Sequence, residues 1–187
     1  MSEQKPEPSR YSPLDALGEA FRVLTGDPGP LELHGGDLGD ALPRTWLRLD
    51  DMQTLLLEQK TSCPGRDAAW RALAAKARSE DPAWVVGAVG VALPRLRQIT
   101  ERLIGGSAAD RPDIEAVVLS AFVEALRSIS LEHRHVEQRL LWSAHRAGAW
   151  RMYAARPAES GAAPAERLGV SFRAVLPDAV SITHILT

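Results

Sequence analysis

Three long amphipathic segments dominate the second half of the chain. Apolar residues recur every three or four positions from 81 to 104, from 110 to 128 and from 134 to 156. This spacing places apolar side chains on one face of a helix. Gly105-Gly106 and Ser130–His133 separate the segments, so the pattern predicts three successive helices with short connectors. The wide apolar stripes indicate that these helices pack together as a bundle.

The first half of the chain predicts shorter helices. Ser12 followed by Pro13 is typical of a helix start, and the apolar spacing after it predicts a helix over 13–25. Two more helices are expected over 51–60, capped by Asp50, and over 66–79. The turn between these two helices is expected to hold the single cysteine, Cys63.

Glycine and proline interrupt residues 26–50, and two interpretations of this segment remain open. Leu31–Leu33 and Trp46–Leu49 alternate in a way that suits a small antiparallel hairpin. The alternative, which we favour, is an ordered loop that fills gaps in the helical core with Leu38, Leu42 and Trp46.

The two ends of the chain differ in composition from its middle. Residues 1–11 are polar and contain two prolines, which predicts disorder. Residues 157–187 begin like a linker and then regain apolar character, and the β-branched residues after 180 indicate a short C-terminal strand. The sequence therefore predicts a mainly α-helical bundle, formed by a single domain over residues 12–156, with a linker and tail after it.

Composition narrows the classes of function. The 187 residues carry a formal net charge of −2, so nucleic-acid binding requires a local basic face. No apolar run approaches the ~20 residues that span a bilayer. A lone cysteine together with a polar N-terminus favours the cytoplasm. Only three of the 22 basic residues are lysine, a bias typical of high-GC genomes such as those of actinobacteria.

No motif in the chain indicates catalysis, a metal or a cofactor. His133 and His135 lie two positions apart, and such residues face different sides of a helix, so they do not form a metal-binding pair. Cys63 has no histidine close to it in sequence. The glycine-rich turns lack the Lys-Ser/Thr of a phosphate-binding loop. We therefore expect no enzyme activity and no cofactor, and an enzyme whose site assembles only in space is the least favoured alternative.

The distribution of charge is more informative. Residues 134–156 contain five arginines and one acidic residue, Glu137, with Trp142, Trp150 and Tyr153 between them. Arginines hold phosphates and aromatic rings stack on bases, so this combination is typical of a surface for single-stranded nucleic acid. The same arginines would also suit an ordinary solvated helix face. The segment before it, from 110 to 127, is mainly acidic.

Three runs of residues carry a family resemblance. They are Leu103-Ile104-Gly105-Gly106, Asp113-Ile114-Glu115-Ala116-Val117-Val118 with Phe122-Val123-Glu124-Ala125-Leu126, and Leu140-Leu141-Trp142-Ser143-Ala144-His145-Arg146. In order and spacing, residues 81–156 resemble region two of bacterial RNA polymerase sigma factors, especially the extracytoplasmic-function type. The departures are Ala147 in place of the usual Asn, and Leu119-Ser120 in place of a Gln-Glu pair.

The resemblance implies two partners. In sigma factors the second of these helices docks on the clamp helices of the polymerase, and the matching positions are Asp113, Glu115, Phe122 and Glu124. The third helix and the connector before it engage the melted promoter strand, and the matching positions are His133, Arg134, Arg139, Trp142, Arg146 and Trp150.

These matches predict a sigma-factor-like transcription regulator. Its partners would be core RNA polymerase, or another transcription regulator, and single-stranded promoter DNA, with no role at a membrane. The main alternative is a helical protein–protein interaction module that binds no nucleic acid. The oligomeric state stays open.

Overall fold

The computed structural model describes residues 12–38, 42–58, 61–79, 81–105 and 111–154. It confirms a mainly helical fold with a small antiparallel hairpin. The predictions for residues 1–11 and 157–187, including the C-terminal strand, lie outside the described residues. The elements are α1 (Pro13–Thr25), β1 (Glu32–His34), the short 3₁₀ helix η1 (Gly35–Leu38), β2 (Trp46–Arg48), α2 (Leu49–Leu57), α3 (Cys63–Ala77), α4 (Ala83–Ile104), α5 (Arg111–Ser128) and α6 (Val136–Ala154).

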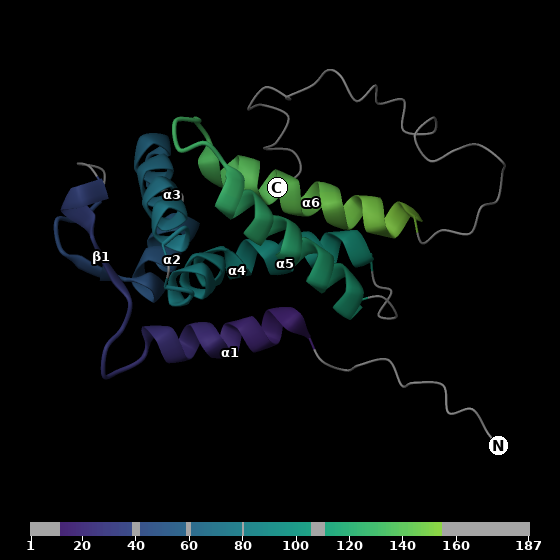
Figure 1. Cartoon of the computed structure of the whole chain (residues 1–187), viewed down its shortest axis with the longest axis horizontal. Helices are drawn as coiled ribbons and strands as arrows, with labels where there is room; N and C mark the ends of the chain where they lie inside the picture. The colour runs from purple at the N-terminus through teal and green to yellow at the C-terminus, as the bar shows by residue number, and fades with distance from the viewer. Residues whose placement is uncertain (1–11, 39–41, 59–60, 80, 106–110, 155–187) are drawn as a thin grey trace.

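Helix α4 runs through the centre of the molecule. It packs against α1, α2, α3, α5 and α6. Figure 1 shows α1 along one side of α4 and α5, with α6 on the opposite side and α2, α3 and the hairpin gathered at one end. Every residue from Gly87 to Leu93 is buried. One continuous cluster of buried apolar side chains includes residues from all of these helices and from both strands.

A glycine on α4 lets α1 lie close to it. A Cβ atom added at Gly90 would come within 1.9 Å of Cδ2 of Phe21, a contact that no side chain tolerates. Phe21 is buried on the inner face of α1. The aromatic ring therefore lies directly against the backbone of α4, which only glycine allows at this position.

Pro94 lies inside α4, and the helix continues through it. Proline has no N–H, so the carbonyl four residues earlier, at Gly90, loses its usual helical partner. The side chain of Gln53 replaces that partner, because its Nε2 atom donates to the Gly90 carbonyl at 2.7 Å. Helix α2 thus satisfies a backbone group that proline leaves open in α4.

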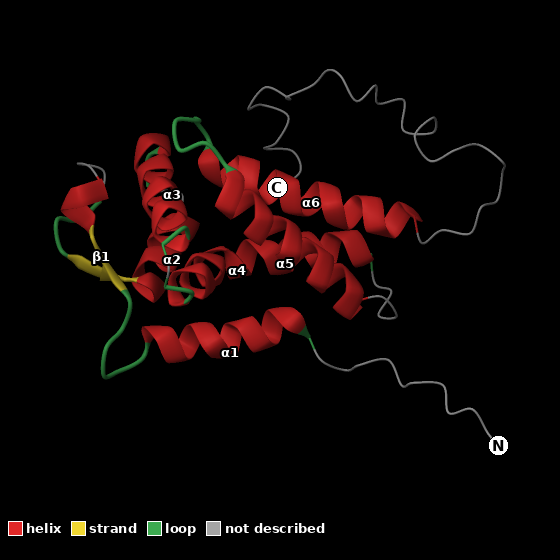
Figure 2. Ribbon diagram, in the orientation of Figure 1, coloured by secondary structure: helices red, strands yellow, loops and turns green. Residues whose placement is uncertain are grey.

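Residues 26–50 contain the hairpin, so the loop that we favoured was wrong. Strands β1 and β2 pair antiparallel with Leu33 opposite Leu47, and Figure 2 shows them as the only strands among the described residues. Leu38 and Leu42 are buried as expected. Trp46 is not, with 67% of its surface exposed. Neighbouring residues of a strand point to opposite faces, so burying Leu47 turns Trp46 outward.

Two helix starts differ from the prediction. Helix α2 begins at Leu49 with Arg48 at its N-cap, so Asp50 lies in the first turn and does not cap it. Helix α3 begins at Cys63, because the hydroxyl of Ser62 accepts a hydrogen bond from the N–H of Gly65 at 3.3 Å. The exposed Cys63 therefore belongs to the first turn of a helix and not to a connecting turn.

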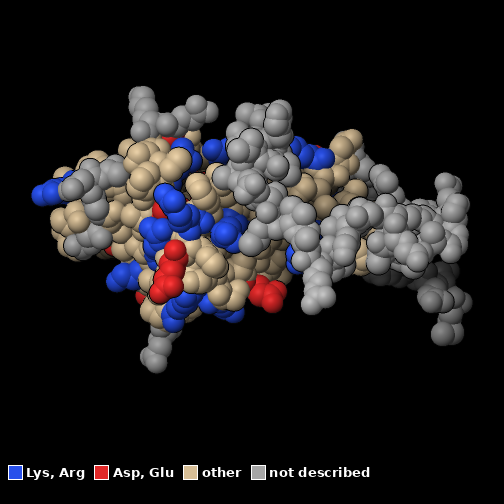
Figure 3. Space-filling model, turned by 90° about the horizontal axis from the view of Figure 1, so that it is seen from above, with Lys and Arg blue, Asp and Glu red and all other residues tan. Residues whose placement is uncertain are grey.

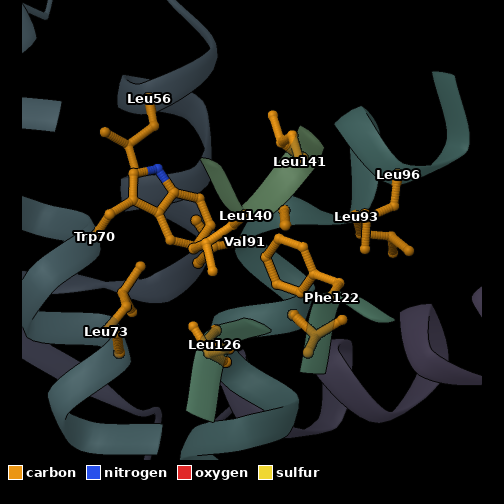
Figure 4. Packing of buried hydrophobic residues seen from close by; sticks show 14 of the residues in the cluster. Leu56, Trp70, Leu73, Val91, Leu93, Leu96, Phe122, Leu126, Leu140 and Leu141 are labelled. Carbon is orange, nitrogen blue, oxygen red and sulfur yellow. The ribbon is translucent and has the colours of Figure 1, made fainter. Parts of the chain in front are cut away.

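An aromatic pair joins the first half of the chain to the second. Trp70 of α3 and Phe122 of α5 are both buried, and their ring centroids lie 6.1 Å apart at an interplanar angle of 75°. This edge-to-face arrangement is a favourable one for aromatic rings. Figure 4 shows the two rings surrounded by aliphatic side chains from several elements, including Leu56, Leu73, Val91, Leu126 and Leu140.

The contact between Gly90 and Phe21 predicts the effect of one added methyl group. Gly90→Ala should lower the free energy of unfolding by ~1–3 kcal/mol, because the ring of Phe21 has to move away from α4. Gly29→Ala is the matched control, since nothing lies within 4 Å of a Cβ at that position. Urea denaturation of both variants checks this, and equal midpoints for the two would contradict it.

Candidate nucleic-acid interface

Four of the predicted DNA-binding residues lie on one side of α6. Arg139, Trp142, Arg146 and Trp150 follow one another at intervals of three, four and four positions. Such intervals place residues on the same face of a helix. Arg146 and Trp150 are exposed, and Arg139 and Trp142 are partly exposed. We call these four residues the α6 outer face.

Each tryptophan ring of this face contacts a neighbouring side chain of α6. Trp150 is 47% exposed, and its ring stacks on Tyr153 at a centroid distance of 6.3 Å and an angle of 26°. The guanidinium of Arg146 lies over the ring of Trp142, 6.0 Å from its centroid. Figure 3 views the molecule from the side on which α6 lies, and basic side chains predominate there over acidic ones.

The other two predicted residues, His133 and Arg134, lie in the connector between α5 and α6, and both are exposed. The carbonyl of Arg134 accepts a hydrogen bond from Nε of Arg139 at 3.2 Å. This bond joins the connector to the first turn of α6. The six residues thus follow one another from the connector onto the α6 outer face.

The one acidic residue of α6 does not weaken this basic face. Glu137 points inward, where its carboxylate lies 3.4 Å from Nη1 of Arg66 on α3. Burial raises the pKa of Glu137, and the nearby Arg66 and Arg95 act in the opposite direction. Because the carboxylate is turned toward α3, the positive charges of Arg139 and Arg146 remain uncompensated by α6 itself.

Protonation is disfavoured at a histidine that lies beside the face. His145 is half-buried, with its ring 6.4 Å from that of Trp142. Burial lowers the pKa of His145, and the positive charge of Arg102 on α4 lowers the pKa further. The positive charge around this part of α6 therefore comes from arginines, which stay protonated at any physiological pH.

Helix α3 supplies a cap for α6 that we did not predict. The carboxylate of Asp67 accepts hydrogen bonds from the backbone N–H groups of His135 and Val136, both at 2.9 Å. These are donors that a helix N-terminus leaves unpaired, and a carboxylate also suits the positive end of the helix dipole. His135 has a φ of 58°, an uncommon value for a residue other than glycine.

Arg71 of α3 and Arg78, the C-cap residue of the same helix, hold the rest of the connector. Arg71 donates to the carbonyls of Leu131 and His133, at 2.8 and 3.1 Å. Arg78 donates to the carbonyls of Leu126 and Ile129 at the end of α5. Asp67, Arg71 and Arg78 are spaced by four and seven positions, so they share one side of α3. This shared stripe is the only trace of their role in the sequence, since their partners are backbone atoms far along the chain.

The predicted polymerase-binding residues divide into two pairs. Asp113 and Glu124 are exposed and lie eleven positions apart, close to three helical turns, so they share the outer side of α5. Nη2 of Arg151 on α6 lies 3.2 Å from Oδ2 of Asp113, in an exposed ion pair. Glu124 borders a shallow hollow along α5, lined also by Leu119, Ser120, Val123, Arg127 and Ser128.

Glu115 and Phe122 belong to the interior, which corrects our assignment of them to a partner-binding surface. Glu115 is 4% exposed, and its carboxylate accepts a hydrogen bond from the hydroxyl of Ser12 at 2.6 Å. Phe122 is fully buried against Trp70. The N-terminus of α1 and helix α3 cover the side of α5 on which these two residues lie. Their side chains hold the bundle together.

Comparison with models of protein families, with curated proteins and with solved structures found no match. Among the described residues, no group of three or more His, Cys, Asp and Glu side chains is placed to hold a metal ion. In the same part of the chain, no helix has the length and apolar character needed to cross a membrane.

The lowered pKa of His145 predicts a dependence of stability on pH. The unfolded chain takes up a proton near the ordinary pKa of 6.5, before the folded protein does. The stability that this histidine contributes is therefore present above that pH and is lost as the pH falls through the lower, folded-state pKa. The free energy of unfolding of His145→Gln, followed by urea denaturation, should fall less steeply below about pH 6.5 than that of the wild type. Parallel pH profiles for the two proteins would contradict it.

Proposed function

We propose that this protein is a sigma-factor-like transcription regulator that binds single-stranded promoter DNA through α6 and RNA polymerase through α5. The observation that carries the proposal is the gathering of Arg139, Trp142, Arg146 and Trp150 on one side of α6. Arginines scattered around a helix would suit any solvated surface, whereas alternating cations and rings on one face suit a nucleic-acid strand.

Single-stranded nucleic acid fits this face better than a duplex does. Unpaired bases present flat faces that stack on exposed aromatic rings, and the phosphates between them bind arginine. Trp150 leaves nearly half of its surface open, next to the ring of Tyr153. The bases of a duplex are already stacked on one another, so a duplex offers no free base face on which these rings could stack. The strand in a melted promoter provides the chemistry that the face requires.

Helix α5 offers a separate surface for the polymerase. Its outer side carries Asp113 and Glu124, and the ion pair from Asp113 to Arg151 shows that the start of α5 lies beside the end of α6. The two helices therefore run antiparallel, with the carboxylates of Asp113 and Glu124 exposed on α5 and arginines exposed on the outer side of α6. A protein that binds both an enzyme and a nucleic acid benefits from such a separation, because each surface disfavours the other partner.

The turn before α5 also supports the resemblance. Gly105 adopts a left-handed conformation, with φ of 58°, and caps the end of α4. It stands where sigma factors have the turn that ends the first helix of region two. The order α4, α5 and α6 and the position of this turn thus suit the proposed relationship.

A helical interaction module without nucleic acid is the second candidate. The observation that favours it is the exposure of two large apolar side chains far from α6, Val23 at 79% and Trp46 at 67%. Tryptophan is frequent among the residues that dominate protein–protein binding. This candidate predicts that substitution of Trp46 affects partner binding more than substitution of Trp150 does.

The proposal predicts a specific loss of DNA binding from one tryptophan. Trp150→Ala should weaken binding to a single-stranded oligonucleotide about tenfold, because base stacking on a ring contributes ~1–3 kcal/mol. Trp46→Ala is the matched control, since it removes another exposed tryptophan. Fluorescence anisotropy measures both affinities. Equal affinities for the two variants, or no binding by the wild type, would overturn the DNA-binding part.

Arg146 tests the electrostatic part of the same surface. Arg146→Gln should reduce the slope of log affinity against log salt by about one, because one phosphate contact is lost. Arg22→Gln removes an equal charge from an exposed position on α1, where Arg22 pairs with Glu19, and should leave the slope unchanged. The same slope for both variants would mean that Arg146 holds no phosphate.

Charge reversal on α5 tests the polymerase surface. Glu124→Arg should reduce co-purification with core RNA polymerase several-fold, since like charges across an interface cost several kcal/mol. Asp51→Arg makes the same charge change on the exposed side of α2 and should co-purify like the wild type. Neither variant should change binding to single-stranded DNA. If the wild type itself fails to co-purify, the polymerase part of the proposal falls.

A further inference from the structure

The connector between α5 and α6, residues 129–135, has an unusual division between backbone and side chains. Its backbone is bound to α3 along most of its length, whereas the side chains of His133 and Arg134 are exposed. A segment built only to join two helices does not need this many partners. A bound backbone with exposed side chains is the arrangement expected of a segment that presents those side chains in fixed positions.

The bonds to α3 cover both ends of the connector and its middle. Arg78 binds the carbonyls at the end of α5, Arg71 binds the middle and Asp67 binds the start of α6. Oδ2 of Asp67 also lies 3.7 Å from Nη2 of Arg71, so the carboxylate and the guanidinium form an ion pair with each other. Asp67 is buried, which strengthens its bonds because water competes poorly there.

The backbone of His135 depends on these hydrogen bonds more than the rest of the connector does. His135 holds a left-handed backbone conformation that is uncommon for residues with a side chain. The bond from its N–H to Asp67 offsets that cost. Without the carboxylate, we expect the backbone at His135 to relax, and His133 and Arg134 to leave their places beside the α6 outer face.

A fixed connector matters for binding because ordering a mobile segment opposes association. Each side chain that becomes immobilised on binding costs ~0.5–1.5 kcal/mol, and backbone ordering adds to this cost. A connector that α3 already holds in place avoids most of the cost. We therefore expect removal of the bonds to α3 to weaken binding even though every residue of the α6 outer face is kept.

We propose that Asp67 and Arg71 of α3, with Arg78, are positioning residues for nucleic-acid binding, which hold His133 and Arg134 in line with the α6 outer face. This inference rests on the proposed function, since it concerns the same surface. It assigns a role to α3, which lies outside residues 81–156, the stretch on which the proposed relationship rests.

Asp67→Asn separates positioning from simple electrostatics, because the two predict opposite signs. The substitution removes a negative charge close to the basic surface, which by itself tightens the binding of a polyanion. It also replaces one of the two acceptor oxygens by an NH₂ group, which cannot accept from the N–H that faces it. The positioning role predicts weaker binding to a single-stranded oligonucleotide, by roughly five- to tenfold, with an unchanged salt slope.

Arg71→Met is the second variant, and it keeps the apolar stem of the side chain while removing the bonds to Leu131 and His133. Its matched control is Arg22→Met, which removes the same charge from exposed α1. Arg71→Met should weaken binding about fivefold more than its control does. Because Arg71 is partly exposed, this variant is expected to fold, and it decides the question should Asp67→Asn fail to fold.

Hydrogen exchange of the free proteins provides the readout that separates the possible outcomes. The amides of residues 129–136 should exchange faster in both α3 variants than in the wild type. Faster exchange with unchanged or tighter binding would overturn the positioning role and leave the proposed function standing. Unchanged exchange would overturn it as well. If the wild type does not bind the oligonucleotide, the proposed function and this inference fall together.

Discussion

The burial of the middle of α4, from Gly87 to Leu93, is the constraint on which the rest of the structure depends. A helix that packs against five others has little room for large side chains there, and at Gly90 the ring of Phe21 lies directly against its backbone. Its internal Pro94 requires a donor from α2, which Gln53 provides. Because α4 fills the centre, α5 and α6 are left at the surface, with their outer sides open to partners.

Local patterns predicted the helices well, since a helix depends on residues three and four positions apart. Ser12 and Pro13 mark the start of α1 in the structure as they do in the sequence. The hairpin was harder, because pairing and register depend on residues on two separate strands. Trp46 illustrates the difficulty: hydrophobicity alone suggests that it is buried, and only the pairing of Leu47 with Leu33 shows that it faces outward.

The candidate site shows the same contrast between features that local spacing determines and features that distant residues determine. Spacing along one helix was enough to place Arg139, Trp142, Arg146 and Trp150 on one face. Glu115 and Phe122 were misassigned because a motif position does not reveal which side of α5 the earlier helices cover. The role of Asp67 could not be predicted at all, since its partners are backbone N–H groups 68 and 69 positions away, and any residue supplies those.

The hydrogen bonds between α3 and the connector have a consequence for folding during translation. Translation produces Asp67 long before Val136, and Arg78 comes 48 residues before Leu126. While the ribosome adds those residues, the backbone groups that Asp67 and Arg78 bind do not yet exist, so these bonds form only after the second half of the chain is made. The dependence also runs the other way. A fragment that starts at residue 81 contains α4, α5 and α6, yet its last helix begins without the cap that Asp67 provides. The three long helices that dominate the sequence pattern are therefore a shorter length of chain than the one that the contacts of α6 require.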